Sequence, residues 1–405
     1  MIAPVSGSQR YAILDVLRGL ALLGIVMANF PEFSLYSFMT ESDKAAMPSA
    51  GIDFITNIFL YIFIDGKFYT IFSLLFGIGF SIIIANVKKR GGNGYAVFYR
   101  RMCILLLIGL IHLFFLWSGD ILMLYALVGM LLPLFRNCSN RGLLRWALLF
   151  LILPVVVDFV VQWCNFSPSA VLIEQEWVLC NKYGITQENF AYWLRDASNY
   201  NDVFKFLLQG AVERMTEFID GNRYFKVLGL FLIGFYIGRN KLYARLGLLE
   251  HLIKKIALMG LLGGIPLSVL YALSCIYAHP VGLGFHSVMY FLSVYLTAFG
   301  YVAVIILWYQ RNRKNVLLKI LCYPGRMALT NYIGQSAIGM FVFYGIFLGF
   351  GASVGLFQVE VVAVIVFVIE TGVSKVWLNY LKFGPLEWIW RCFTYGKIFS
   401  LIRRK

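Results

Sequence analysis

The chain has 405 residues, of which 60% are apolar and only 14% are charged, whereas a soluble domain carries roughly 25% charged residues. Most of it lies in apolar runs, and about 20 such residues suffice to cross a bilayer. The net charge of +15 does not indicate nucleic-acid binding, because the basic residues occur in short bursts between these runs. Composition therefore predicts an all-α, polytopic integral membrane helical bundle in contact with the lipid bilayer.

Ten apolar runs predict about ten transmembrane helices. They cover residues 12–30, 68–87, 102–117, 121–135, 146–162, 226–238, 256–277, 287–308, 328–348 and 359–378. Several are short for a full crossing, which predicts tilted helices or locally thinned lipid. A further run at residues 51–64 predicts a helix that lies on the surface or packs inside the bundle. The first run is charged near its start and has no small-residue cleavage site, so we interpret it as a retained span rather than a signal peptide.

The basic residues predict an orientation. With a cytoplasmic N-terminus, the connections predicted to lie inside contain 25 of the 35 lysines and arginines. The outer connections between spans three and four, seven and eight, and nine and ten contain none. This distribution satisfies the positive-inside rule and predicts that both termini are cytoplasmic.

We expect a single transmembrane helical domain over residues 1–405, with two polar segments attached to it. Residues 163–225 are predicted to cap the extracytoplasmic face, and their parts 187–197 and 202–218 look like amphipathic helices. Residues 383–391 alternate aromatic and charged groups, which is typical of an interfacial helix, and residues 379–405 are predicted to form a cytoplasmic C-terminal tail.

The seven cysteines are an odd number, and most lie within or beside predicted spans. Cys164 and Cys180 fall in the predicted cap, where a disulfide is one alternative if that compartment is oxidising. No spacing of cysteine and histidine resembles a metal site, so no metal is predicted.

One histidine lies inside an apolar run. His112 can act as a proton acceptor near neutral pH. The run continues through Ser118 and Gly119 to Asp120 and then directly into the next span, so this hairpin places Asp120 at the outer level of His112. The carboxylate can orient the imidazole or stabilise its protonated form. The alternative, a histidine that is merely satisfied by a neighbour, stays open.

Other ionisable groups lie at the ends of spans. Asp15 and Arg18 share a face of the first span and can pair, either to orient this helix or as part of a site. Asn29 closes the same span near its outer end. Asp65 and Lys67 precede the second span and add two charges at the outer mouth, unless they form a solvated turn.

The ninth predicted span carries a polar stripe. Arg326, Thr330 and either Gln335 or Asn331 lie in successive turns of its inner half, and such a stripe must face the bundle interior. Glu370 and Lys375 of the tenth span are expected to pair with this stripe or with each other. The stripe lines a ligand cavity or joins helices by polar contacts, and both interpretations remain.

The strings that carry these residues resemble the bacterial YeiB-like membrane proteins, a family that mostly lacks an assigned reaction. The resemblance covers nearly the whole chain and rests on residues 14–19 (LDVLRG) with Asn29, 109–122 (GLIHLFFLWSGDIL), 325–332 (GRMALTNY) and 384–388 (GPLEW). That family is similar to transmembrane acyltransferases, including the lysosomal heparan glucosaminide acetyltransferase and envelope-sugar O-acetyltransferases. The resemblance implies acyl-coenzyme A as co-substrate without a tightly bound cofactor, a glycan or lipid-linked acceptor, and the bacterial inner membrane as location.

The resemblance also implies roles for the residues named above. A histidine is the base in that group, and in the lysosomal enzyme it closely follows the asparagine, whereas residues 30–49 contain none here. We therefore predict that His112, assisted by Asp120, deprotonates the acceptor and that Asn29 steadies the oxyanion. The residues predicted to bind substrate or donor are Asp15, Arg18, Asp65, Lys67, Arg326, Asn331 and Gln335.

Two other functions stay open. A transporter or exporter would use the polar residues of spans one, three, nine and ten along its path, with His112 and Asp120 coupling protons. A non-catalytic sensor or assembly factor would bind a partner through residues 163–225. A homodimer is a further alternative.

Overall fold

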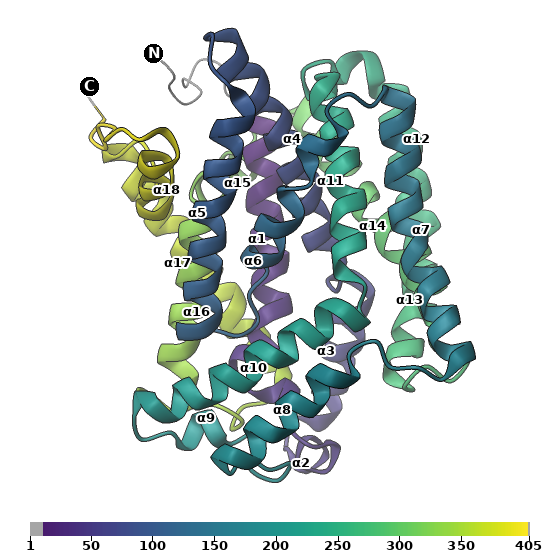
Figure 1. The fold of residues 1–405 in the computed structure, drawn as a ribbon, viewed down its shortest axis with the longest axis vertical. Coiled ribbons are helices and arrows are strands. Elements are labelled where there is room, and N and C mark those ends of the chain that lie inside the picture. Colours follow the sequence, from purple (N-terminus) through teal and green to yellow (C-terminus); the bar gives the residue numbers. More distant parts are fainter. Residues whose placement is uncertain (1–10, 404–405) are drawn as a thin grey trace.

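The computed structural model describes residues 11–403, which are almost entirely helical (Figure 1). Within this range the only β-type contact is an isolated bridge between Leu381 and Ile402. The prediction of an all-α fold is confirmed. The α-helices, in chain order, are α1 Ala12–Phe33, α2 Glu41–Ala46, α3 Ala50–Phe63, α4 Lys67–Lys89, α5 Gly94–Phe115, α6 Leu122–Gly129, α7 Asn140–Cys164, α8 Ala170–Tyr183, α9 Trp193–Asp196, α10 Tyr200–Asp220, α11 Arg223–Arg239, α12 Glu250–Leu262, α13 Gly264–Ile276, α14 Leu283–Arg311, α15 Val316–Arg326, α16 Ala328–Phe343, α17 Leu356–Tyr380 and α18 Pro385–Tyr395.

Seven helical segments of the described chain are long and apolar enough to cross a membrane. They are Ala12–Phe33, Ala50–Lys89, Gly94–Phe115, Asn140–Cys164, Leu246–Ile276, Leu283–Arg311 and Leu356–Tyr380. This confirms a polytopic membrane bundle. The count of ten spans stays a prediction, because α6, α11 and α16 have only 8, 17 and 16 residues. An untilted crossing takes about 20.

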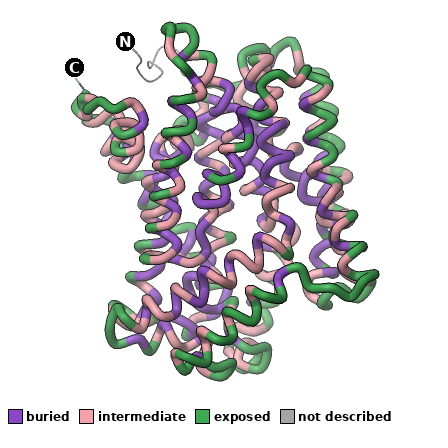
Figure 2. Tube along the Cα trace, viewed as in Figure 1, coloured by how far each residue is buried: buried purple, intermediate pink, exposed green. Residues whose placement is uncertain are grey.

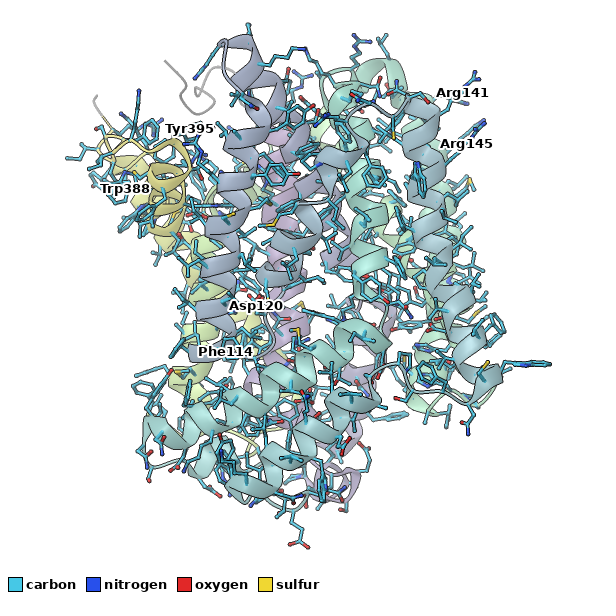
Figure 3. All side chains as sticks on the ribbon, viewed as in Figure 1. Phe114, Asp120, Arg141, Arg145, Trp388 and Tyr395 are labelled. Carbon is cyan, nitrogen blue, oxygen red and sulfur yellow. The ribbon has the colours of Figure 1, made fainter. Side chains whose placement is uncertain are left out.

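The bundle has two chemically different ends (Figures 1 and 3). α18 lies at the same end as the start of α7 with Arg141 and Arg145, and we call this the basic end. α8, α9 and α10 lie across the opposite end, which we call the cap end. Asp120 lies between the two, nearer the cap end. That the basic end faces the cytoplasm stays a prediction from the positive-inside rule.

Exposed residues follow the outside of the bundle (Figure 2), and many of them are large and apolar. On α7, Leu148, Val156 and Val160 are each at least half exposed, at 54%, 50% and 55%. Monomeric soluble proteins rarely expose such a continuous apolar surface, whereas a helix facing lipid tails is stable with it. The outer surface of the bundle is therefore suited to direct contact with the bilayer.

Close contacts between helices depend on glycine at two places. A Cβ atom on Gly19 would lie 1.9 Å from a main-chain oxygen of α15, and one on Gly325 would lie 1.9 Å from that of Asp15. Added Cβ atoms on Gly77 of α4 and Gly234 of α11 would each lie 2.1 Å from a main-chain oxygen of the facing helix. These glycines let the two helix pairs approach backbone to backbone, as small residues commonly do in membranes.

Three segments differ from the sequence-based prediction. Residues 316–326, predicted as part of an inner connection, form α15, whose amphipathic sequence a hydropathy search does not detect. The predicted span 256–277 is divided at Gly263, because Pro266 has no N–H with which to continue the helical hydrogen bonding. Residues 187–192 form turns instead of the predicted amphipathic helix, which is reduced to the four residues of α9.

Candidate functional site

His112 and Asp120 are in direct contact at the centre of the candidate site. His112 Nδ1 lies 2.9 Å from Asp120 Oδ1. The second carboxylate oxygen accepts the main-chain N–H of Met123 at 2.7 Å and so caps the first turn of α6. Both side chains are buried, with residue exposures of 2% and 1%. Asp120 thus fixes the imidazole and the start of α6 at once.

A third side chain completes this arrangement. Ser336 of α16 places its Oγ 2.9 Å from His112 Nε2, and it is also buried. The sequence analysis named the polar stripe of this helix but missed Ser336. The signal was its position next to Gln335 and one turn after Tyr332, but nothing local indicates a partner 224 residues away.

The partners define where the protons lie. Asp120 Oδ1 must accept, so His112 Nδ1 carries the hydrogen and Nε2 of the neutral ring is an acceptor. Ser336 Oγ is 2.9 Å from that nitrogen but 3.4 Å from the carbonyl oxygen of Tyr332. The shorter contact is the stronger, so the hydroxyl donates to His112. The result is a carboxylate, an imidazole and a hydroxyl connected in series.

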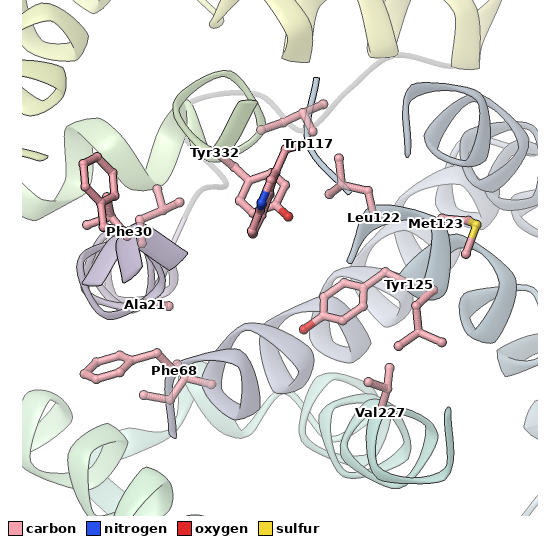
Figure 4. Packing of buried hydrophobic residues seen from close by; sticks show 14 of the residues in the cluster. Ala21, Phe30, Phe68, Trp117, Leu122, Met123, Tyr125, Val227 and Tyr332 are labelled. Carbon is pink, nitrogen blue, oxygen red and sulfur yellow. The ribbon is translucent and has the colours of Figure 1, made fainter. Parts of the chain in front are cut away.

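A cavity of about 540 Å³ runs through the bundle beside these residues. Its wall follows α1 from Arg18 to Glu32, a distance of about 21 Å at the rise of an α-helix. Phe68, Trp117, Tyr125 and Tyr332 are among the side chains that line it (Figure 4). Its middle is apolar and aromatic, and its charged residues gather at the two ends.

Four arginines line the cavity at the basic end, namely Arg18, Arg101, Arg326 and Arg391. Arg18 pairs with Asp15 at 2.9 Å, as the sequence predicts. The guanidinium of Arg101 stacks on Trp390 of α18, 3.4 Å from the ring centre. Arg101, Trp390 and Arg391 were not predicted as site residues, because nothing in the sequence brings α18 to the start of α5.

Glu387 of α18 also belongs to this end of the cavity. Its carboxylate accepts the main-chain N–H of Leu329 at 2.7 Å and the hydroxyl of Thr330 at 2.6 Å. An acid at this position satisfies N–H groups that the first turn of α16 leaves without helical partners. The helix that carries Ser336 is therefore fixed by α18 at the basic end.

At the cap end, Arg214 of α10 joins three elements. It donates to Glu32 of α1 at 3.0 Å and to the carbonyl oxygen of Ser118 at 3.1 Å. Its side chain is only 8% exposed, and both it and Glu32 line the cavity. Arg214 also forms an ion pair with Glu217 on its own helix. The cap is thus connected to the hairpin that carries Asp120.

A carboxyl group of the cap has an unusual proton affinity. Burial, together with the negative charges of Glu176, Glu217 and Glu32, raises the pKa of Glu213 to about 8. Arg214 opposes this shift but does not cancel it. Glu213 therefore changes its charge within the physiological pH range.

Some of the remaining predicted residues line the cavity, and the others bond to neighbouring parts of the bundle. Asn29, Asp65 and Arg326 line the cavity. Lys67 is fully buried, so the alternative of a solvated turn is wrong for it, and its Nζ donates to the carbonyl oxygen of Tyr61 at 2.6 Å. Asp65 instead accepts the hydroxyl of Tyr271, which also lines the cavity.

Asn331 and Gln335 face α17 rather than the cavity. The amide of Asn331 donates to Ser374 at 3.0 Å, and that of Gln335 donates to Glu370 at 2.8 Å. Lys375 is exposed, so the expectation that it faces the polar stripe is wrong, whereas Glu370 does so. These contacts join helices. Of the stripe, Arg326 lines the cavity, and Ser336 contacts His112 behind the cavity wall.

Neither a disulfide nor a metal cluster occurs in the described part of the chain. Cys164 and Cys180 are both free thiols. No group of three or more His, Cys, Asp or Glu side chains gathers among residues 11–403.

Comparison with known proteins finds a family model that matches the C-terminal part of the chain. Residues 237–397 match a family model described as "Protein of unknown function (DUF418)". The chain is 29% identical to "Uncharacterized protein YxaH" of Bacillus subtilis (strain 168), covering 97% of this chain and 96% of the relative. It is 27% identical to "Uncharacterized protein YeiB" of Escherichia coli (strain K12), covering 95% and 96%.

A third relative is the "Uncharacterized 39.9 kDa protein in amylase 3'region" of Bacillus acidopullulyticus, 29% identical over 99% of both chains. No solved structure matches the chain. The similarity extends over nearly the full length of each relative, and no printed name assigns an activity.

Proposed function

From the premise that this chain is a YeiB-like membrane protein, as its family match and full-length relatives show, we propose that it is an acyltransferase of the bacterial inner membrane. It transfers an acyl group from acyl-coenzyme A to a hydroxyl or amine of an acceptor such as a sugar. The donor enters from the basic end and the acceptor from the cap end.

The contact between His112 and Asp120 carries this proposal. A base must have an unprotonated nitrogen and a fixed orientation. Asp120 supplies the orientation at 2.9 Å, and the unprotonated Nε2 accepts the hydroxyl of Ser336, which substrate has to replace or use. Trp117 and Tyr332 adjoin both the imidazole and the cavity, since both rings line the cavity and their centres lie 6.0 and 5.3 Å from that of the imidazole. The base is therefore close to the cavity of about 540 Å³.

The charge at the basic end supports a polyanionic donor. Arginine binds phosphate in bidentate fashion, and Arg101, Arg326 and Arg391 with Arg18 converge on this end of the cavity. An extended, uncharged arm reaching along the apolar middle would bring its thioester toward His112. Asn29 lines the cavity wall near the cap end, which supports its role as a donor to the developing oxyanion.

The test separates donor binding from transfer. Acetyl-coenzyme A binding to detergent-purified protein is measured by calorimetry for the wild type, Arg101→Gln and Arg145→Gln. Arg145 is exposed at the same end and does not line the cavity, so it controls for loss of charge alone. We expect Arg101→Gln to weaken binding about tenfold or more, which corresponds to 1.4 kcal/mol, and Arg145→Gln to leave it unchanged.

His112→Ala should retain donor binding and lose transfer to a panel of sugar and lipid-linked acceptors. No binding of acetyl-coenzyme A or of longer acyl donors would contradict the proposal. Full transfer by His112→Ala would remove the assigned base.

A transporter is the second candidate, favoured by one observation. A single cavity is lined by charged residues at both ends of the bundle, as a translocation path would be. Uptake into proteoliposomes that depends on a pH gradient and yields no acylated product would replace the acyltransferase with this function.

A further inference from the structure

Ser336, His112 and Asp120 form the series that activates serine nucleophiles. The hydroxyl is 2.9 Å from Nε2, and Nδ1 is 2.9 Å from the carboxylate. In such a series the imidazole accepts the serine proton while the carboxylate holds the imidazole in the correct tautomer. The three residues come from α16, α5 and the hairpin before α6, so no local sequence motif produces this alignment.

We propose that Ser336 is a nucleophile that carries the acyl group as an ester between donor and acceptor. This inference rests on the proposed acyl transfer for its substrate class, a thioester. It replaces direct transfer by two steps, and both use the same base, His112.

The steps balance in atoms and protons. Ser336 Oγ attacks the thioester carbonyl as its proton passes to His112 Nε2, the carbon–sulfur bond breaks, and the thiolate leaves with that proton. The acceptor hydroxyl or amine then attacks the serine ester and gives its proton to His112. The carbon–Oγ bond breaks, and Ser336 recovers the proton.

The surroundings of Ser336 support a role as a reacting nucleophile more than a role as a structural hydrogen bond between helices. Two other polar side chains of this helix, Asn331 and Gln335, join α16 to α17 through amide groups that donate to a hydroxyl and a carboxylate of α17. Only Ser336 is aligned with an imidazole that a carboxylate orients. Tyr332, one turn earlier, lines the cavity, and its hydroxyl lies near the main-chain N–H of Ile121 without completing a hydrogen bond. That hydroxyl is available to donate to the oxyanion.

Access requires movement of a ring. Ser336 is 1% exposed and does not itself line the cavity. Trp117 and Tyr332 form the intervening wall, and both are single side chains that can change rotamer. The nucleophile is thus covered in the empty protein and reached when a donor displaces one of these rings, which would also limit hydrolysis of the ester.

The test detects the covalent bond directly and needs no knowledge of the acceptor. Purified protein is treated with a fluorophosphonate, which reacts with activated serines, or with acetyl-coenzyme A, and analysed by intact-mass and peptide mass spectrometry. We expect one adduct, located at Ser336. It should be absent in Ser336→Ala and form about 10³-fold more slowly in His112→Ala and Asp120→Asn.

Ser374→Ala is the matched control. Ser374 is buried in α17 and bonded to Asn331, with no histidine beside it, so its loss should leave the adduct unchanged. If Ser336→Ala fails to fold, Ser336→Cys keeps a similar volume and should accumulate a hydroxylamine-sensitive thioester. Retention of each fold is checked by thermal unfolding.

The outcomes distinguish this inference from the proposed function. No adduct on the wild type with either reagent, or full acyl transfer by Ser336→Ala, overturns the nucleophile and leaves direct transfer by His112 standing. A fluorophosphonate adduct at Ser336 in a protein that binds no acyl donor supports the nucleophile and overturns the acyltransferase instead.

Discussion

Asp120 shows how much of this site one residue supports. Its two carboxylate oxygens serve different elements, one the imidazole of His112 and the other the N–H of Met123 in α6. The pairing was predictable, because a short hairpin between two apolar runs returns the chain to the same level. The serine on the far side of the imidazole was not, because that contact depends on how α16 packs against α5. Sequence reasoning therefore gave two members of the series and missed the third.

The protonation of Glu213 predicts a pH-dependent stability. Its pKa is about 8 in the folded protein against an ordinary value of 4.5. The folded state therefore holds the proton more tightly than the unfolded state. The stabilisation of the folded state that results is complete below pH 4.5 and is lost as the pH rises toward 8. One proton can change the free energy of unfolding by at most about 1.4 kcal/mol per pH unit.

We expect thermal unfolding of the wild type to shift to lower temperature between pH 5 and pH 8.5 and that of Glu213→Gln to shift less. Gln keeps the shape of the side chain and cannot ionise. Glu188→Gln, an exposed residue of the same segment, is the control and should follow the wild type. Equal pH slopes for all three proteins would show that Glu213 is solvated when ionised.

The contact of α1 with α15 predicts a strict requirement for glycine. A Cβ on Gly325 would lie 1.9 Å from the main-chain oxygen of Asp15, a distance that only a shift of the backbone can relieve. We expect Gly325→Ala to destabilise the protein by about 1–3 kcal/mol, the usual cost of overpacking. Thermal unfolding in detergent measures the change.

Gly372→Ala is the counterpart on α17, where nothing lies within 4 Å of the added methyl group. It should be neutral or slightly stabilising, because alanine favours the helix. A Gly325→Ala protein as stable as Gly372→Ala would mean that α1 and α15 separate easily. Hydropathy could not predict the contact of α1 with α15, since it treats α15 as a connection. Gly19 and Gly325, which form this contact, nevertheless both belong to the sequence strings that carry the family resemblance.

The contacts of Arg214 with α1 and with the hairpin before α6 predict that α10 closes the cap end of the cavity. Removing Arg214 leaves the part-buried Glu32 without its ion-pair partner and breaks the contact of α10 with α1, which weakens the attachment of the cap. We expect Arg214→Ala to raise, by about tenfold or more, the rate at which a membrane-impermeant thiol reagent labels Ala28→Cys. Ala28 lines the cavity on α1, and the assay uses a background without the seven native cysteines.

Arg195→Ala controls for the loss of a cap arginine, because the guanidinium of Arg195 bonds Asp196 at the surface. Its labelling rate should equal that of the parent. An unchanged rate in Arg214→Ala would mean that the cap stays closed without this residue, and α10 would then be a fixed part of the wall.

The helical bundle as a whole was largely predictable, but the number of helices that cross the membrane was not. Long apolar runs give α1, α4, α7, α14 and α17 within a few residues, because the bilayer sets a fixed length for a crossing helix. Shorter runs do not say whether a helix crosses alone, pairs with a turn or lies inside the bundle. α6 and α11 are of this kind, and both contribute to the cavity wall, so hydropathy informs least about this part of the functional region.

The distribution of charge predicts which end of the molecule faces the cytoplasm. Arg145 lies at the basic end, and Glu188 belongs to the connections between α8 and α9 at the cap end. Both are exposed, and so is Ile398 after α18, at 89%. Single cysteines at these positions report the side of the membrane.

In intact cells we expect an impermeant maleimide to label Glu188→Cys at once, and Arg145→Cys and Ile398→Cys only after the membrane is permeabilised. Basic loops are retained on the cytoplasmic side, so the end with α18 and Arg145 should be protected. Labelling of Arg145→Cys but not Glu188→Cys in intact cells would reverse the orientation and exchange the donor and acceptor ends. A third pattern is that Ile398→Cys and Glu188→Cys are labelled while Arg145→Cys is protected. It would require an odd number of membrane crossings between Arg145 and the C-terminus. An arrangement with α18 and Arg145 at the same end excludes an odd number.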